Sequence, residues 1–258
     1  MDDTYQAYLN RMMRATLPDA HLMQVSNVQE SPKFSRTGEA WVPSSFPGHT
    51  VITPPGRADT ANEGVYEFLA QYQSELAAKL GEDLFIPIPK DSFHLTLADL
   101  IWDSAYEHAV KTDPSFDHKL QAGIAGSFQQ SSHLRSRTPI PFRLAGLMVM
   151  TRALAVSLVA TDETGYRQVL EMRRSIYQNP DLISIGIEQQ YHFTPHITLG
   201  YFGSLKGVDR AVLTQTIDDL NQPWIMTDRT FWLKEAQLRK FPNMVTYDRE
   251  ADWATFEF

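Results

Sequence analysis

Cysteine is absent from the 258-residue chain, and long apolar runs are absent as well. Without cysteine there can be no disulfide, no thiol nucleophile and no thiolate-bound zinc or iron-sulfur cluster. No apolar run approaches the ~20 residues that span a bilayer, and no leader-like segment begins the chain. We therefore expect a soluble, unprocessed, cytoplasmic protein whose chemistry comes from other side chains.

An excess of positive charge is also missing, because the net charge is −8. Affinity for long nucleic acid comes mainly from Lys and Arg that neutralise phosphates, so a protein that coats RNA or DNA is disfavoured. Small phosphorylated ligands remain possible. The basic stretch 131–143 carries His133, Arg135, Arg137 and Arg143, and it fits either a solvated loop or a lid that grips phosphate.

Several common catalytic signatures are missing too. The chain has no G-x-S-x-G elbow and no G-x-x-x-x-G-K-S/T loop, so serine hydrolases and P-loop enzymes are disfavoured. His192 and His196 have the spacing of a helical zinc pair, but Pro195 lies between them in a β-branched run. We predict no metal and no cofactor.

The hydrophobic pattern predicts alternating strands and helices. Thr60 and Glu63 suggest a capping box, and Thr161, Asp162 and Glu163 supply the start of a later helix that Asn179-Pro180 ends. The stretch 31–46 is predicted to be loop with a short hairpin. Helices are expected over 5–12, 60–80, 101–122, 163–177 and 206–220, and strands over 49–53, 84–88, 93–97, 142–150, 154–160, 193–201, 230–238 and 252–258.

Both halves share one order: a strand, a capped amphipathic helix, then a strand with His-x-Thr. The motifs are HLTL at 94–97 and HITL at 196–199. Alternation places each His and Thr on one face, about 6.5–7 Å apart, and the aliphatic residues on the other. If the halves form two lobes about a pseudo-two-fold axis, two imidazoles and two hydroxyls would line one groove.

Two imidazoles in one groove suit a reaction that needs a base and an acid in one step. Threonine hydroxyls can hydrogen-bond oxygens on which charge accumulates during phosphoryl transfer. Either histidine alone is more simply a core or surface residue. The pair, each in an equivalent unit, favours function.

This pattern resembles the two-histidine (2H) phosphoesterase superfamily, with the segment FPGHTVI pointing to a bacterial branch of unknown function. The resemblance implies an α+β, bilobal fold with antiparallel sheets lining a central groove and helices outside. It implies a single domain over 1–258, with an N-terminal helix and loop extension over 1–45 and lobes over 46–130 and 142–258.

The resemblance also implies roles for individual residues. His94 and His196 would form the acid-base pair, and Thr96 and Thr198 would contact the phosphate, while the residues alone do not say which histidine is the base. Strict alternation places Tyr201 on the core side. Further candidate substrate contacts are Tyr201, Arg143 and His49.

The function expected is a metal-independent phosphodiesterase acting on a 2',3'-cyclic phosphate or a related cyclic-nucleotide or RNA-end phosphodiester. One alternative is a non-catalytic protein that binds a nucleotide or RNA end. Another is a hydrolase of cyclic oligonucleotide signals. The partner would be a small phosphorylated nucleotide or RNA end, without membrane contact, and the oligomeric state stays open.

Overall fold

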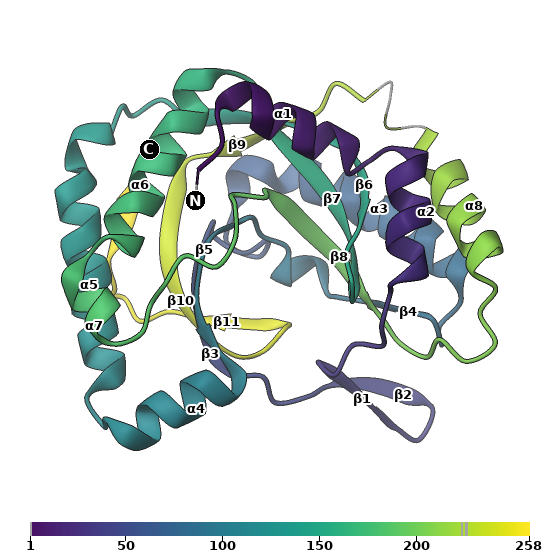
Figure 1. Ribbon diagram of the computed structural model, residues 1–258, viewed down its shortest axis with the longest axis horizontal. Coiled ribbons are helices and arrows are strands. Elements are labelled where there is room, and N and C mark those ends of the chain that lie inside the picture. The colour runs from purple at the N-terminus through teal and green to yellow at the C-terminus, as the bar shows by residue number, and fades with distance from the viewer. Residues whose placement is uncertain (1, 223, 225–226) are drawn as a thin grey trace.

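Two antiparallel sheets face each other at the centre of the molecule, with helices around them (Figure 1). This computed structural model describes residues 2–222, 224 and 227–258. None of the helices in those ranges has both the length and the apolar character that crossing a membrane requires. The prediction of an α+β fold with antiparallel sheets and outer helices is confirmed.

Each sheet combines strands from distant parts of the chain. Sheet I has the order β11-β10-β3-β5, with β12 on β10, and comprises β3 (Gly48–Ile52), β5 (Thr96–Trp102), β10 (Glu235–Asn243), β11 (Thr246–Asp248) and β12 (Thr255–Glu257). Sheet II has the order β4-β8-β7-β6-β9 and comprises β4 (Phe85–Pro87), β6 (Ile140–Val149), β7 (Ala153–Ala160), β8 (His196–Phe202) and β9 (Thr230–Leu233).

The chain therefore crosses between the sheets in both halves. Strand β4, from the predicted first lobe, pairs with β8, while β10, from the predicted second lobe, pairs with β3. Both sheets thus contain strands from the ranges 46–130 and 142–258. The division into those two lobes stays a prediction, as does the single domain.

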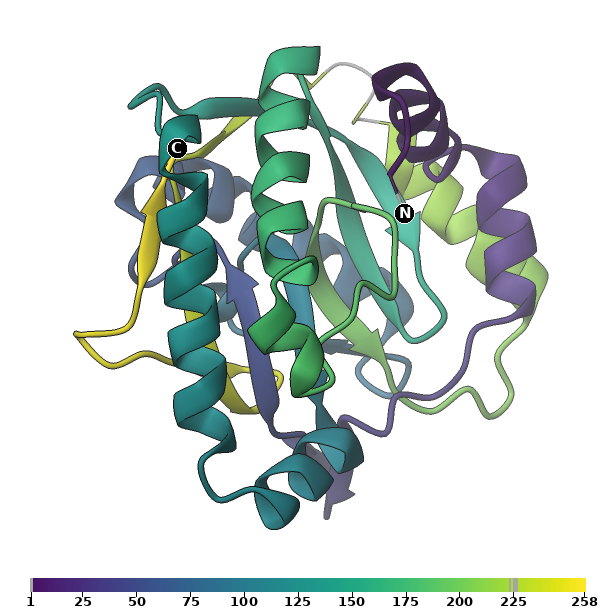
Figure 2. The ribbon, with the colours of Figure 1, turned by 60° about the vertical axis from the view of Figure 1, so that its left-hand side comes forward.

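The helix that precedes each motif also connects the two sheets. Helix α3 (Glu63–Leu80) follows β3 of sheet I but packs on β4 and β8 of sheet II. Helix α6 (Glu163–Tyr177) follows β7 of sheet II and contacts β5 of sheet I. Helix α5 (Phe116–Gln130) lies beside α6 and also covers sheet I (Figure 2).

The first 45 residues form two helices and the predicted hairpin. Helix α1 (Tyr5–Arg14) packs on β7, where the Tyr8 hydroxyl accepts a hydrogen bond of 2.9 Å from the Ala160 amide. Helix α2 (Pro18–Ser26), which periodicity did not predict, packs on α8 (Arg210–Asn221). The hairpin pairs β1 (Phe34–Thr37) with β2 (Ala40–Pro43).

Several predicted element boundaries differ from those in the structure. The helix predicted over 101–122 is two helices, α4 (Asp103–Thr112) and α5, because the Asp113 side chain accepts a bond from the Ser115 amide and turns the chain. Asp59, not Thr60, caps the turn before α3. The predicted end of α6 before Asn179-Pro180 is confirmed, and Pro180 also begins α7 (Pro180–Ser184), a first helical position where Pro is favoured.

Candidate active site between the two motif strands

The two motif histidines are held in the same way. His94 Nδ1 lies 2.7 Å from the Ser92 carbonyl oxygen, and His196 Nδ1 lies 2.7 Å from the Thr194 carbonyl oxygen. A carbonyl only accepts, so Nδ1 carries the proton in both rings. Each ring is half-buried, and neither Nε2 forms a hydrogen bond within the described residues. Both Nε2 atoms are therefore left to take or give a proton.

The predicted alternation holds within both motifs. Thr96 and Thr198 are half-exposed, and their hydroxyls form no hydrogen bond to any described residue. The four aliphatic positions are fully buried, at 0% exposure: Leu95, Leu97, Ile197 and Leu199. Each motif thus packs its aliphatic side chains into the core and leaves an imidazole and a hydroxyl accessible.

Both motifs contain a β-bulge at their fourth residue. Ile52 pairs with Thr96 and Val51 with Ala98, so Leu97 is the extra residue in β5. The same shift in the pairing of β7 with β8 leaves Leu199 as the extra residue in β8. A bulge residue has no ladder partner, so its backbone carbonyl needs another donor.

The helices supply those donors across the halves. Gln73 of α3 donates from Nε2 to the Leu199 carbonyl, at 2.5 Å, and to the Ile88 carbonyl, at 2.7 Å. Arg173 of α6 donates to the Leu97 carbonyl and, at 3.1 Å, to the Tyr191 carbonyl. The helix before each motif therefore supports the other motif, which couples the two strands.

The bulge in β8 corrects the expectation for Tyr201. Opposite residues of an antiparallel pair share a face, and β7 places Ser157 opposite His196 and Ala153 opposite Tyr201. Residues 157 and 153 lie on the same face of β7, so Tyr201 shares the face of His196 and does not point to the core side. Its ring packs against Phe34, with centroids 5.4 Å apart. Substrate contact by Tyr201 remains a prediction.

Charged neighbours distinguish the two histidines. The pKa of His94 is lowered to about 4, mainly by burial; the hydrogen bond to the Ser92 carbonyl acts in the opposite direction, and the positive charges of His196 and Arg239 contribute to the lowering. Burial also lowers the pKa of His196, but Asp99 acts in the opposite direction and Lys33 adds to the lowering. The carboxylate therefore favours a proton on His196 rather than on His94.

Arg143 and His49, the other candidate contacts, lie elsewhere. His49 opposes Ile101, not a motif residue, and its Nε2 lies 3.2 Å from an Asp117 carboxylate oxygen of α5, on the helix-covered side of sheet I. The ring is completely buried. Arg143 is exposed on β6 and lies 3.6 Å from Asp228. Neither is brought beside the motif histidines by a described contact.

The structure also adds groups that the sequence pattern did not single out. Tyr247 of β11 packs edge-on against His94, with ring centroids 4.4 Å apart. Arg239 opposes Thr50 in the register of β10 with β3, and Asp99 opposes Thr50 from β5, so both share the face of Thr50. Lys33 belongs to the N-terminal segment. Alternation around His94 could have suggested Asp99, had the bulge at Leu97 been known.

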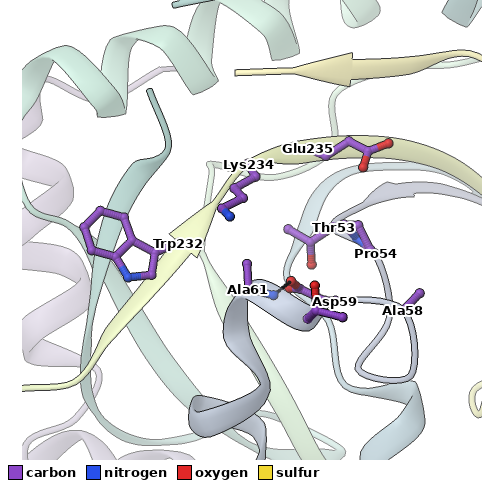
Figure 3. Close-up of a pocket in the computed structure, with 9 residues that line it drawn as sticks. Thr53, Pro54, Ala58, Asp59, Ala61, Trp232, Lys234 and Glu235 are labelled. Atoms are coloured by element: carbon purple, nitrogen blue, oxygen red, sulfur yellow. Dashed lines mark hydrogen bonds between the residues drawn. The ribbon is translucent and has the colours of Figure 1, made fainter. Parts of the chain in front are cut away.

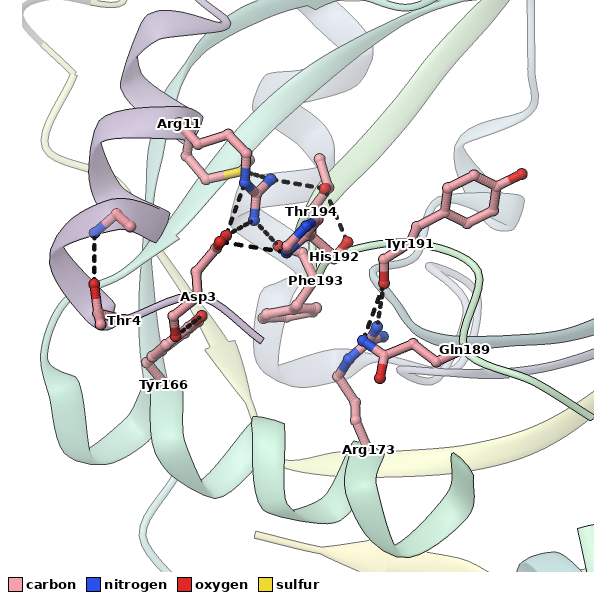
Figure 4. A network of polar contacts seen from close by, with 12 residues as sticks. Asp3, Thr4, Arg11, Tyr166, Arg173, Gln189, Tyr191, His192, Phe193 and Thr194 are labelled. Carbon is pink, nitrogen blue, oxygen red and sulfur yellow. Dashed lines mark hydrogen bonds and ion pairs between the residues drawn. The ribbon is translucent and has the colours of Figure 1, made fainter. Parts of the chain in front are cut away.

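A polar network holds the loop before the second motif (Figure 4). Arg11 of α1 donates to the Thr194 hydroxyl at 2.9 Å and to the Phe193 carbonyl at 2.8 Å, and it pairs with Asp3 at 2.9 Å. Asp3 also lies 3.3 Å from His192. Because Thr194 offers its carbonyl to His196, this network fixes the orientation of the imidazole.

A separate cavity of about 150 Å³ opens near the start of α3 (Figure 3). Thr53, Asp59, Trp232 and Lys234 are among its lining residues, and none of the motif histidines or threonines is. Asp59 is already engaged there, since it accepts bonds from Asn62 and Tyr66. We assign this cavity no part in the chemistry.

Potential metal ligands do not cluster in the described part of the chain. Across the described ranges 2–222, 224 and 227–258, no group of three or more His, Asp or Glu side chains has an arrangement that could hold a metal ion. His192 pairs with Asp3, while His196 Nδ1 is bonded to the Thr194 carbonyl.

Comparisons with known proteins bear on the fold. No protein-family model and no curated protein sequence matches the chain. Among solved structures, the conserved protein of unknown function ATU0111 from Agrobacterium tumefaciens matches with a TM-score of 0.56 and 16% identity, over 85% of this chain and 90% of that one. This likeness shows a shared fold.

Looser structural matches also cover most of the chain. Escherichia coli LigT, solved with 3'-AMP, matches with a TM-score of 0.38 and 15% identity, over 81% of this chain and 92% of that one. Kluyveromyces marxianus Usb1 matches with a TM-score of 0.43 and 12% identity, over 83% and 98%. Their superposition is too loose to support an argument about chemistry.

Proposed function

We propose that the chain is a two-histidine phosphoesterase that hydrolyses a small phosphodiester, with a nucleoside 2',3'-cyclic phosphate or a related RNA end as substrate. The observation that carries the proposal is the paired presentation of His94 and His196. Both rings are anchored through Nδ1 on a backbone carbonyl two residues earlier, and both leave Nε2 unbonded.

We assign His94 as the general base. Its charged neighbours, His196 and Arg239, both disfavour a proton on the ring, and its pKa is lowered to about 4. A neutral imidazole with the proton on Nδ1 has its lone pair on Nε2. That atom would take a proton from a water molecule as the water oxygen attacks phosphorus.

We assign His196 as the general acid. Asp99 favours the protonated ring, and a bound phosphate anion would favour it further. As the bond between phosphorus and the leaving ribose oxygen breaks, Nε2–H would give its proton to that oxygen. Thr96 and Thr198 would donate their hydroxyl protons to the non-bridging oxygens, where negative charge accumulates.

A substrate panel with chelator present tests the reaction class. The panel contains 2',3'-cyclic nucleotides, 3',5'-cyclic nucleotides, short cyclic oligonucleotides and 2'-5'-linked RNA, each with EDTA. We expect turnover of a 2',3'-cyclic phosphate that EDTA does not reduce. Loss of all activity with EDTA would refute the two-histidine mechanism, and saturable binding without product would support a binding protein instead.

A further inference from the structure

Lys33, in the N-terminal segment, lies against Tyr201 of β8. The segment is tied to β8, since the Ser31 amide donates to the Phe202 carbonyl at 2.8 Å. The Lys33 ammonium lies over two rings, 5.2 Å from the Tyr201 centroid and 4.7 Å from the Phe46 centroid. Tyr201 shares the strand face of His196, so Lys33 lies on the face of sheet II that carries His196.

The ammonium of Lys33 has no anionic partner in contact with it. Within the described residues it forms no hydrogen bond and no ion pair within 4.0 Å, although its side chain is half-buried. A partly buried cation is costly unless an anion or hydrogen-bond acceptors compensate it. The aromatic faces compensate only part of that cost.

The charges that face Lys33 come from several elements. Asp99 of β5 and Asp103 of α4 favour its charged form, while Arg152 of the β6–β7 turn opposes it. On β8, His196 is in turn affected by the lysine. Burial is the largest influence and lowers the pKa of Lys33 to about 8. An additional anion at this place would favour the charged form and raise the pKa again.

We propose that Lys33 is a substrate-binding residue and that the phosphate held between the two histidines is the anion that neutralises it. This inference rests on the proposed function for the place of the phosphate. It gives the N-terminal segment a part in the site: the segment would supply the cation that holds the substrate, while the two motif strands supply the acid, the base and the hydroxyls.

The test measures binding of inorganic phosphate by calorimetry at pH 7. We expect Lys33→Met to weaken phosphate binding about tenfold or more, since charge-assisted hydrogen bonds to phosphate are strong. Lys33→Arg should keep most of the affinity. Lys206→Met, which removes an exposed lysine outside the groove, is the matched control and should bind like the wild type.

Two further measurements distinguish phosphate binding by Lys33 from an indirect effect of its charge on the Asp99 carboxylate. If Lys33 acts only as a neighbour of Asp99, the effect of Lys33→Met should vanish in an Asp99→Asn background. If it binds phosphate, the effect should persist there. NMR of the 13C-methylated lysines should also show the pKa of Lys33 rising when phosphate is added.

The outcomes for this inference and for the proposed function are distinguishable. Phosphate affinity that Lys33→Met leaves unchanged, or wild-type protein that binds no phosphate, overturns the role of Lys33, even if cyclic phosphates are hydrolysed. Phosphate binding that depends on Lys33 without turnover of any phosphodiester supports Lys33 and refutes the proposed hydrolase.

Discussion

The HLTL and HITL regions have the same local geometry but different electrostatic surroundings. Each presents a histidine anchored through Nδ1, a half-exposed threonine and a bulge at the fourth residue. Around His94 the neighbouring charges are positive, from Arg239 and His196, whereas the charges that act on His196 are the carboxylate of Asp99 and, in the opposite direction, the ammonium of Lys33. Backbone geometry thus makes the two motifs equivalent, and the neighbouring charges make them different.

This difference matters because acid-base catalysis needs two groups in different protonation states. A symmetric pair of histidines would have no preferred direction of proton transfer. Residues outside the motifs create the preference here: Asp99 lies after the first motif on β5, and Arg239 comes from β10. The predictions below test the equivalence and the difference in turn.

Removing either histidine should have the largest effect. His94→Ala and His196→Ala should each lower kcat by about 10²- to 10⁴-fold, the usual contribution of general acid-base catalysis. Steady-state kinetics with a 2',3'-cyclic nucleotide measures this, and circular dichroism controls for folding. Unchanged turnover in either variant would show that the assignment is wrong.

The threonines should matter next. Thr96→Val and Thr198→Val remove the hydroxyls but keep the shape, and we expect kcat to fall by about 10²-fold in each, as for other donors to a developing oxyanion. KM should change much less. If one variant behaves like the wild type, only one strand contacts the phosphate and the equivalence of the motifs fails.

Arg173→Gln tests the swapped supports. This variant replaces the arginine of α6 with glutamine, the residue that has the equivalent role in α3 at Gln73. A glutamine can still donate to the Leu97 carbonyl, so we expect the kcat of Arg173→Gln to remain within about tenfold of the wild type. Arg173→Leu leaves that buried carbonyl without a donor, and it should lower the free energy of unfolding by about 1–3 kcal/mol. Urea unfolding compares the two variants. Equal losses in both would show that the hydrogen bond is not what matters.

His49→Leu contrasts a structural histidine with the catalytic pair. The substitution removes the hydrogen bond between His49 and Asp117. Asp117 still accepts hydrogen bonds from Lys240, at 2.6 Å, and from Tyr106, at 3.0 Å. We expect a loss of about 1–3 kcal/mol in the free energy of unfolding, with kcat within about twofold of the wild type at a temperature where the variant is folded. A large fall in kcat at unchanged stability would show that His49 takes part in catalysis.

Asp99→Asn should have the smallest effect but tests the asymmetry directly. Without the carboxylate, the pKa of His196 falls further, so the alkaline limb of kcat/KM should move to lower pH by about one unit, the scale of a nearby charge. The acid limb should move less, because no direct effect of Asp99 on His94 is resolved. If instead the acid limb alone shifts, the roles of the histidines are reversed.

Much of the fold was predictable because its elements have strong local signals. The helix at 163–177 begins where Asp162 accepts a bond from the Gly165 amide, and the alternation within each four-residue motif is as expected. The strand exchange between halves was not predictable, because periodicity says which face is buried but not which strand pairs with it.

In the candidate site, too, the features that depend on local alternation were predictable, and those that depend on strand pairing were not. His94, Thr96, His196 and Thr198 follow from alternation within each motif. The orientation of Tyr201 does not, because one extra residue in β8 shifts every later side chain to the other face. His49 likewise reads as a groove residue from its place near Gly48, but sheet register turns it toward α5.

The pH dependence of kcat/KM for the wild-type protein tests the central claim most directly. With a 2',3'-cyclic nucleotide and EDTA present, we expect a bell-shaped dependence of kcat/KM on pH, since one imidazole must be neutral and the other charged. Both histidine pKa values are lowered, that of His94 to about 4 and that of His196 below its ordinary 6.5, so the maximum should lie on the acid side of neutrality. The limbs belong to the coupled pair. A rate that does not vary between pH 4 and 9, or that is lost with EDTA, would contradict the account.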